Sequence, residues 1–319
     1  MTAQLDASGR LRHLLTLEGL PRAVIERLLD RAQALLPHAH GGTALRGTLA
    51  GKAVCTLFFE PSTRTRSSFQ LAAARLGADI LNFDASTSST KKGETAADTL
   101  RTIGAMGVHG FVVRHPGDGA VALLAEVAGG DTALVNAGDG RHEHPTQGLL
   151  DMLTLRQAKG ADFRRLKVLV VGDVRHSRVA RSGLHALRTL GAGEGSSIDI
   201  RVCGPKSLLP DAAELGDCSV GQDFDAALEG VDVVMMLRLQ RERMESGLVS
   251  SLEDYHRDYG LTAARLRRAA PEAIVMHPGP MNRGVEIDAD VADGPQSRIL
   301  VQVANGVAVR MAVLEELLA

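Results

Sequence analysis

The 319-residue sequence contains no tryptophan and few aromatic side chains, seven phenylalanines and two tyrosines. Proteins that bind single-stranded nucleic acids or sugars rely on aromatic rings as stacking platforms, so both functions are disfavoured. An excess of basic charge is also missing, because 36 lysines and arginines face 38 aspartates and glutamates and the basic residues are spread along the chain. Nucleic acid is therefore not an expected partner.

Cysteines and long apolar runs are scarce as well. Cys55, Cys203 and Cys218 are too few and too scattered for a disulfide framework or a paired-cysteine metal site, and the first two lie in apolar runs typical of buried positions. No run of about eighteen apolar residues occurs, which excludes a membrane-spanning helix, and the first residues lack the pattern of a signal peptide. We expect a cytoplasmic protein.

Two common nucleotide-binding patterns are also missing. Neither GxxxxGK[ST] nor a full GxGxxG occurs, which disfavours nucleotide kinases and nicotinamide enzymes. The His-Glu-His cluster at 142–144 is a weak metal candidate, because no further ligand follows at helical spacing and HExxH is absent. We therefore predict neither a metal nor an organic cofactor.

Short apolar runs alternate with longer segments of helical periodicity, and this rhythm is typical of parallel sheets with helices on both faces. The length favours two domains. We predict two doubly wound parallel-sheet α/β domains, residues 1–155 and 156–297, with a helix at 298–319 packing back on the first and the active site in the cleft between them. The predicted strands are Lys52–Phe59, Asp79–Phe83, Gly110–Arg114, Ala133–Asn136, Leu166–Val171, Ser197–Val202, Val231–Leu237 and Ala273–Met276.

Polar residues follow several of these strands. Ser62–Arg66, read Ser-Thr-Arg-Thr-Arg, comes directly after the first strand and before a helix, an arrangement suited to phosphate. Arg114 ends the third strand and adds a second cation at the same edge. His144 and Gln147 follow the fourth strand three residues apart, so that both can face one ligand carbonyl.

The second half has its own cations at strand ends. Arg178 opens the helix after Leu166–Val171, and Arg238, followed by Gln240, ends Val231–Leu237. Two such arginines can hold two carboxylates by paired N–H bonds. Together with the turn His277–Pro280, they predict a cleft that binds a dicarboxylate opposite a phosphate compound.

Six motifs in this order resemble signatures of the aspartate/ornithine carbamoyltransferase family, and the resemblance covers essentially the whole chain. They are FEPSTRTR (Phe59–Arg66), STKKGET (Ser89–Thr95), VVRH (Val112–His115), HPTQ (His144–Gln147), RLQ (Arg238–Gln240) and HPGP (His277–Pro280). The ornithine branch typically carries a cysteine in the last motif, whereas this chain does not. The resemblance therefore implies transfer of a carbamoyl group from carbamoyl phosphate to the α-amine of L-aspartate, the committed step of pyrimidine biosynthesis.

The family pattern assigns roles residue by residue. It implies carbonyl polarisation by Thr65, Arg114 and His144, and binding of the carbamoyl amino group by Gln147 and the Pro278 carbonyl. Catalytic roles fall to Arg64, Thr65, Arg114 and His144. The residues matched to carbamoyl phosphate binding are Ser62, Thr63, Arg64, Thr65, Arg114, His144, Gln147, Pro278, Gly279 and Pro280. Those matched to aspartate binding are Lys92, Arg178, Arg238 and Gln240.

The resemblance also implies a homotrimer, because residues matching Ser88 and Lys92 enter the site from a neighbouring subunit. Whether regulatory or dihydroorotase-like chains join the trimer stays open. The sequence leaves two other functions open: a carbamoyltransferase acting on ornithine or a related amine, and a noncatalytic binding subunit that kept the fold. Paired arginines disfavour the first because they would repel an ammonium group, and the full set of candidate residues disfavours the second.

Overall fold

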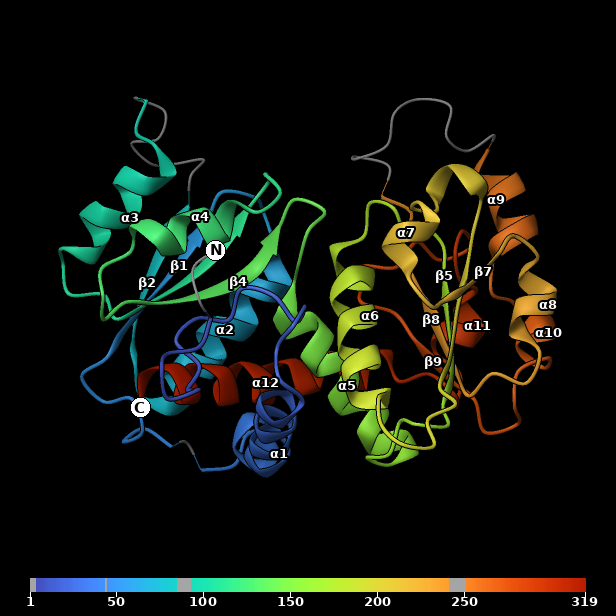
Figure 1. The fold of residues 1–319 in the computed structure, drawn as a ribbon, viewed down its shortest axis with the longest axis horizontal. Coiled ribbons are helices and arrows are strands. Elements are labelled where there is room, and N and C mark those ends of the chain that lie inside the picture. Colours follow the sequence, from blue (N-terminus) through green and yellow to red (C-terminus); the bar gives the residue numbers. More distant parts are fainter. Residues whose placement is uncertain (1–3, 44, 85–92, 241–250) are drawn as a thin grey trace. The chain divides into compact units, whose positions relative to one another are not determined.

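The computed structural model describes residues 4–43, 45–84, 93–240 and 251–319 (Figure 1). The chain divides into two compact units, unit 1 (Met1–Leu153 with Ala304–Ala319) and unit 2 (Thr154–Val303). Unit 1 has a four-stranded sheet and unit 2 a five-stranded sheet, and all strand pairs within them are parallel. The predicted pair of parallel-sheet α/β domains is confirmed.

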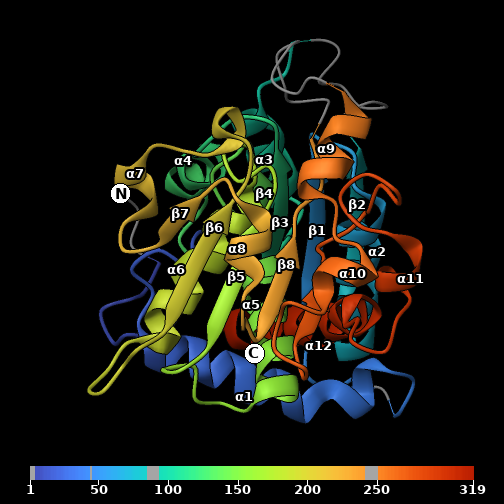
Figure 2. The ribbon, with the colours of Figure 1, turned by 90° about the vertical axis from the view of Figure 1, so that its right-hand side faces the viewer.

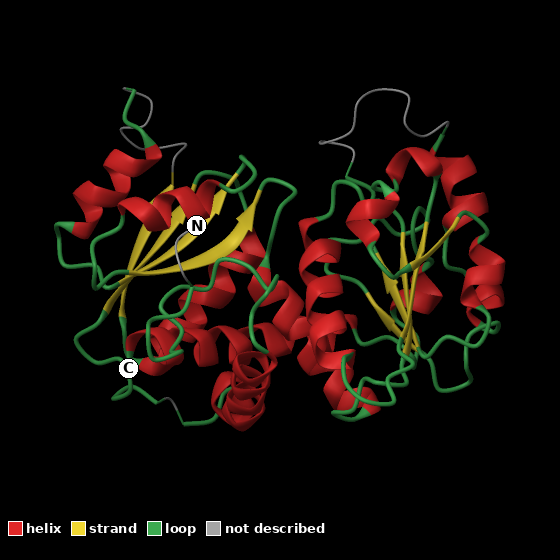
Figure 3. Ribbon diagram, viewed as in Figure 1, coloured by secondary structure: helices red, strands yellow, loops and turns green. Residues whose placement is uncertain are grey.

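In unit 1 the strand order is β2-β1-β3-β4. Figure 3 shows helices on both faces of the sheet. The strands are β1 (Ala53–Phe58), β2 (Asp79–Asp84), β3 (Gly110–His115) and β4 (Ala133–Asp139). The helices are α1 (Arg22–Ala39), α2 (Thr63–Leu76), α3 (Ala96–Gly104) and α4 (Ala120–Val127), together with most of α5 (Pro145–Lys159) and α12 (Ile299–Leu318), whose remaining residues belong to unit 2.

Two-residue periodicity decides which side chains of the unit 1 sheet meet which helices. Cys55 and Leu57 of β1 and Phe111 and Val113 of β3 point to one face, where they form a buried cluster with residues of α3 and α4. α2 and α12 lie on the opposite face (Figure 1). Because both faces are covered, the central strands β1 and β3 are nearly continuous apolar runs, as in most parallel sheets.

Unit 2 has the strand order β7-β6-β5-β8-β9. Figure 2 shows α6 on one side of this sheet and α8 and α10 on the other. The strands are β5 (Lys167–Val171), β6 (Asp199–Cys203), β7 (Ser219–Gly221), β8 (Val233–Met236) and β9 (Ile274–Met276). The helices are α6 (Arg178–Gly191), the 3-10 helix η3 (Lys206–Leu208), α7 (Ala212–Leu215), α8 (Phe224–Leu228), α9 (Leu252–Tyr259), α10 (Ala263–Leu266) and α11 (Ala289–Ala292).

The structure differs from the sequence predictions at several element ends. The helix α2 begins at Thr63, so most of the hydroxyl and arginine residues expected before it form its first turn instead. The strand predicted as Val231–Leu237 is shorter, which places Arg238 two residues beyond β8. The edge strand β7 and the short helices α7 to α11 were not predicted. All three cysteines are free and buried, as expected for Cys55 and Cys203.

Within the described residues no helix is long and apolar enough to cross a membrane.

Candidate active site

In each sheet, the direction in which successive strands are added reverses beside the strands that carry the candidate residues. In unit 1 the connection from β1 leads to β2 on one side, while β3 leads to β4 on the other. In unit 2 the same reversal falls between β5 and β8. Open α/β sheets bind ligands beyond the carboxyl ends of their strands at such reversals. The loops after β1 and β3, and those after β5 and β8, are therefore the expected ligand-binding loops.

The loop after β1 leads into the amino-terminal turn of α2. Ser62 precedes the helix with an extended backbone, and its side chain makes no capping hydrogen bond. The first turn holds no acidic residue, so nothing there neutralises the partial positive charge of the helix end. Thr63 and Arg64 are exposed and Thr65 is buried. A phosphate would meet backbone N–H groups, hydroxyls and a guanidinium at this turn.

The two arginines of this motif differ in orientation. The Arg66 guanidinium lies over the Phe58 ring of β1, with 5.1 Å between its Cζ atom and the ring centroid. Arg64 is exposed at the start of the helix. The sequence prediction that assigned the phosphate to Arg64 and not to Arg66 is compatible with this difference.

Arg114 is fixed on two sides. Its Nη2 donates to Oε1 of Glu60 at 2.6 Å, and its Nη1 donates to the Ala137 carbonyl at 3.2 Å. The Arg114 side chain is only 11% exposed. Its own carbonyl accepts from the Phe59 N–H at 2.8 Å, which joins the loop after β1 to the end of β3. Sequence reasoning did not give Glu60 a role, although it stands inside the FEPSTRTR motif.

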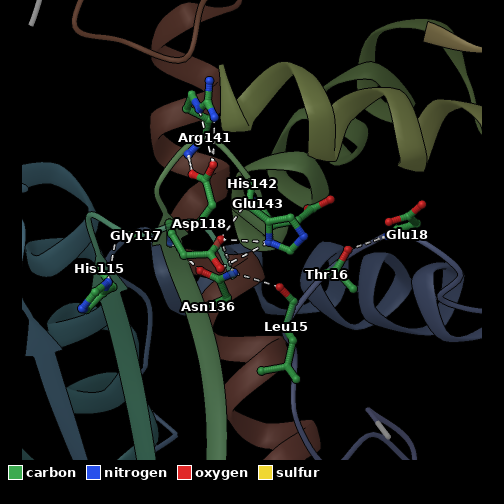
Figure 4. Close-up of polar contacts among 12 residues, drawn as sticks. Leu15, Thr16, Glu18, His115, Gly117, Asp118, Asn136, Arg141, His142 and Glu143 are labelled. Carbon is green, nitrogen blue, oxygen red and sulfur yellow. Dashed lines mark hydrogen bonds and ion pairs between the residues drawn. The ribbon is translucent and has the colours of Figure 1, made fainter. Parts of the chain in front are cut away.

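A buried polar network shapes the turn between β4 and α5 (Figure 4). Asn136 donates from Nδ2 to the Leu15 carbonyl and to Oδ1 of Asp139, both at 2.9 Å. The same Asp139 oxygen accepts from the Glu143 N–H at 3.0 Å. Asn136 and Asp139 are fully buried, so these bonds are not exchanged with water. The network sets the path of the backbone that enters His144.

His144 and Gln147 lie at the amino-terminal end of α5. Both are buried, and the Gln147 N–H donates to the His144 carbonyl at 2.9 Å. The Gln147 side chain donates from Nε2 to Oδ1 of Asp151 at 2.9 Å. The pairings Phe58 with Arg114 and His115 with Asp139 set the ends of β1, β3 and β4 side by side. Unit 1 thus brings the loops that carry its predicted phosphate and carbonyl contacts to one edge.

In unit 2, Arg178 is the first residue of α6 and is buried. Ser177 caps the helix by accepting from the Ala180 N–H at 3.1 Å. The adjacent pairing of Val171 with Met236 places the loops after β5 and β8 next to each other. These loops carry Arg178 on one side and Arg238 and Gln240 on the other, as the prediction requires for a dicarboxylate site.

A buried carboxylate organises the loop after β5. Oδ1 of Asp173 lies 2.8 Å from Nδ1 of His176, and both side chains are buried. Burial raises the pKa of Asp173, and the neighbouring His176 opposes that rise. Gln240 donates from Nε2 to the His176 carbonyl at 3.2 Å. The pair of Asp173 and His176 therefore supports the backbone that leads to Arg178 and also meets the loop after β8.

The turn after β9 has a similar support. Nδ1 of His277 accepts from the Gly279 N–H at 2.8 Å, so its Nε2 carries the proton and donates to Oε1 of Glu286 at 3.2 Å. Glu286 is fully buried and also accepts from the backbone and side chain of Asn282. Gly279 has a φ of +64°, a conformation that favours glycine. The bonds fix the segment that contains Pro278, Gly279 and Pro280.

Residues 12–157 match the family model for the aspartate/ornithine carbamoyltransferase carbamoyl-P binding domain, and residues 164–317 match that for the Asp/Orn binding domain. The chain belongs to the aspartate/ornithine carbamoyltransferase family.

Relatives and solved structures of this family align along the whole chain. The aspartate carbamoyltransferase catalytic subunit of Xanthomonas campestris pv. campestris (strain B100) is 73% identical over 317 residues, 99% of each chain. Aspartate transcarbamoylase from Trypanosoma cruzi, in complex with carbamoyl phosphate and aspartate, gives a TM-score of 0.84 at 32% identity, covering 99% of each chain. Ornithine carbamoyltransferase from Thermus thermophilus gives 0.82 at 26% identity, covering 97% of this chain and 99% of that one.

Ser88 and Lys92 lie outside the described residues. Among the residues that are described, no group of three or more histidines, cysteines, aspartates or glutamates is arranged to hold a metal ion.

Proposed function

We propose that this chain transfers the carbamoyl group of carbamoyl phosphate to the α-amine of L-aspartate, giving N-carbamoyl-L-aspartate and phosphate. The observation that carries the proposal is the placement of Arg178 and Arg238 on the two loops at the strand reversal of unit 2, in a chain 73% identical to an aspartate carbamoyltransferase catalytic subunit. The proposal places the reaction in pyrimidine biosynthesis and the protein in the cytoplasm.

Unit 1 would bind carbamoyl phosphate. The phosphate group meets Ser62, Thr63, Arg64 and the first-turn N–H groups of α2, where the helix end favours an anion. The carbonyl oxygen receives hydrogen bonds from Thr65, Arg114 and His144.

In the proposed reaction, the neutral amine nitrogen attacks the carbamoyl carbon and moves negative charge onto the carbonyl oxygen. The fixed donors around that oxygen stabilise the tetrahedral intermediate more than the ground state. The bond between carbon and the phosphate oxygen then breaks, and the departing phosphate takes the proton of the amine. The chemistry needs no nucleophile from the protein.

Unit 2 would select the amine substrate. Arg178 and Arg238 each offer a planar set of N–H donors that matches a carboxylate, and Gln240 adds a neutral donor. Aspartate has two carboxylates for these two cations, whereas ornithine has one carboxylate and a side-chain ammonium that they would repel. The similar TM-scores to aspartate and ornithine enzymes show that fold alone does not separate the two reactions.

A direct assay tests the proposal. The purified chain is incubated with carbamoyl phosphate and either L-aspartate or L-ornithine, without added metal, and both the ureido product and the phosphate are measured. We expect aspartate-dependent formation of the two products in equal amounts. Product with ornithine alone would overturn the assignment of Arg178 and Arg238, and binding of carbamoyl phosphate without turnover would favour a noncatalytic subunit.

The family resemblance further leads us to propose a homotrimer in which Ser88 and Lys92 act in a neighbouring subunit's site, Lys92 at the aspartate. Two inactive variants, Lys92→Gln and His144→Ala, test it when their subunits are exchanged. Shared sites predict recovered activity, since some sites in a mixed trimer receive both native residues. No recovery despite demonstrated exchange would contradict shared sites, and the mass of the native assembly would reveal any regulatory or dihydroorotase-like partner.

A further inference from the structure

The Gln147 amide has a fixed direction in unit 1. Its Nε2 lies 2.9 Å from Oδ1 of Asp151, one helical turn along α5. A carboxylate has only acceptors, so the nitrogen end of the amide must face it. The oxygen end, Oε1, is turned away from Asp151 and accepts no hydrogen bond from any described residue.

Asp151 belongs to a buried charge arrangement. Its side chain is fully buried, which is costly for a carboxylate without a compensating charge. Arg310 of α12 is also buried, and the negative charge of Asp151 favours its protonated form. Burial lowers the pKa of Arg310 to about 10, which still leaves the guanidinium charged at neutral pH.

Arg310 is confined on two further sides. Its Cζ atom lies 5.0 Å from the centroid of the Phe69 ring, which belongs to α2. A Cβ atom at Gly306 would come within 2.4 Å of its Nη1, so the glycine provides the space for the guanidinium. The cation thus contacts the helix that begins at the phosphate loop and interacts electrostatically with the helix that begins at His144.

We infer that Asp151 and Arg310 are positioning residues that turn the Gln147 carbonyl oxygen toward the amino group of carbamoyl phosphate. The inference rests on the proposed function and adds the reason why Gln147 acts as an acceptor. Arg310 supplies a buried positive charge that interacts with Asp151, Asp151 accepts from the amide nitrogen, and the oxygen end then selects a substrate with N–H donors.

Acetyl phosphate supplies the test, because it has a methyl group where carbamoyl phosphate has the amino group. The ratio of its inhibition constant to the KM for carbamoyl phosphate measures recognition of the amino group and not of the phosphate. A purely structural role of the charge pair would weaken both ligands together and leave this ratio unchanged.

Two double variants separate the effect of the hydrogen-bond acceptor at position 151 from the effect of the two charges. D151N/R310M removes both charges but keeps a side-chain oxygen that can accept from Gln147, while D151L/R310M removes the charges and the oxygen. Replacing both of two buried, interacting opposite charges avoids an uncompensated charge and preserves folding better than removing one. If leucine does not fit, D151A/R310M adds no volume and gives the same comparison.

We expect D151N/R310M to keep the wild-type ratio within about twofold, and D151L/R310M to lower it about tenfold through the KM for carbamoyl phosphate alone. Q147A is expected to show the same loss. If D151L/R310M kept the wild-type ratio while Q147A lowered it, the positioning role of Asp151 and Arg310 would be overturned and the proposed function would stay intact. A wild-type ratio near one would overturn this inference, whereas a wild-type chain without aspartate-dependent product would overturn the proposed function.

Discussion

The two units support their ligand-binding loops in different ways. In unit 1, buried or half-buried acids bond directly to residues proposed to touch the substrate, Glu60 to Arg114 and Asp151 to Gln147. In unit 2, the buried acids Asp173 and Glu286 bond to histidines that shape the neighbouring backbone. Loss of such an acid in unit 1 is therefore expected to misdirect one side chain, whereas loss of one in unit 2 is expected to loosen a loop.

The largest effect is expected for Arg114→Ala in unit 1. The change removes a donor to the carbonyl oxygen, so kcat should fall about 10²–10³-fold while the KM for aspartate changes little. Steady-state kinetics with both substrates varied provides the measurement. Arg22→Ala, which removes a partly exposed arginine paired with Glu26 on α1, is the control and should keep wild-type turnover. An intact kcat in Arg114→Ala would remove Arg114 from the proposed chemistry.

Arg178→Lys in unit 2 should act on binding. Lysine keeps the charge but loses the planar donors, so we expect the KM for aspartate to rise about 10- to 100-fold with little change for carbamoyl phosphate. Arg181→Lys is a matched control one turn along α6, where the arginine pairs with Glu214 in a partly exposed bridge. Equal KM values for the two variants would contradict the carboxylate-binding role of Arg178.

Glu286→Ala tests the loop support in unit 2. The change leaves the donors of His277 and Asn282 without their buried acceptor, so the free energy of unfolding should fall by about 2 kcal/mol. For a unit of this size that corresponds to a thermal midpoint lowered by about 4–8 °C. Glu253→Ala, at an exposed position on α9, should leave the midpoint unchanged. Similar midpoints for both variants would argue against Glu286 as a support.

Asp173→Asn should raise the free energy of unfolding, by less than Glu286→Ala lowers it. Burial raises the pKa of Asp173, so the wild-type protein loses stability as pH rises from the ordinary aspartate value through the folded-state pKa. Asparagine can still accept from His176 but carries no charge. At neutral pH we expect the variant to be more stable by about 0.5–2 kcal/mol, and the gain should shrink as pH falls toward the ordinary aspartate pKa. Urea unfolding at several pH values checks both statements, and a variant less stable than wild type at pH 7 would contradict them.

Much of this arrangement could be predicted from the sequence, because its signals are local. The apolar runs of the main strands and the polar residues just beyond them stand together in the chain, so the sequence alone predicts which sheet edges carry the candidate residues. The short edge strand β7 and the four- to eight-residue helices of unit 2 could not be predicted, because they are too short to show a periodic pattern of apolar residues.

The supporting residues were missed for a different reason. Glu60 and Arg114 are 54 residues apart, and Arg310 interacts with an aspartate on another helix. Pairings of this kind become visible only when strand order and helix packing are known. Asp151 lies one turn from Gln147, but nothing in the sequence separates a buried acid from the exposed acids found at the same spacing on many helices.

The carboxyl-terminal helix α12 has a consequence for synthesis. Ala304–Ala319 belongs with Met1–Leu153, and it supplies Arg310 to the interior as well as Glu315 and Glu316, which pair with Arg31 and Arg27 of α1. On the ribosome, the domain begun first is therefore completed last, after all of unit 2 has emerged. Until the last turns of α12 leave the exit tunnel, Asp151 lacks the positive charge of Arg310. A chain that ends before these turns cannot complete unit 1.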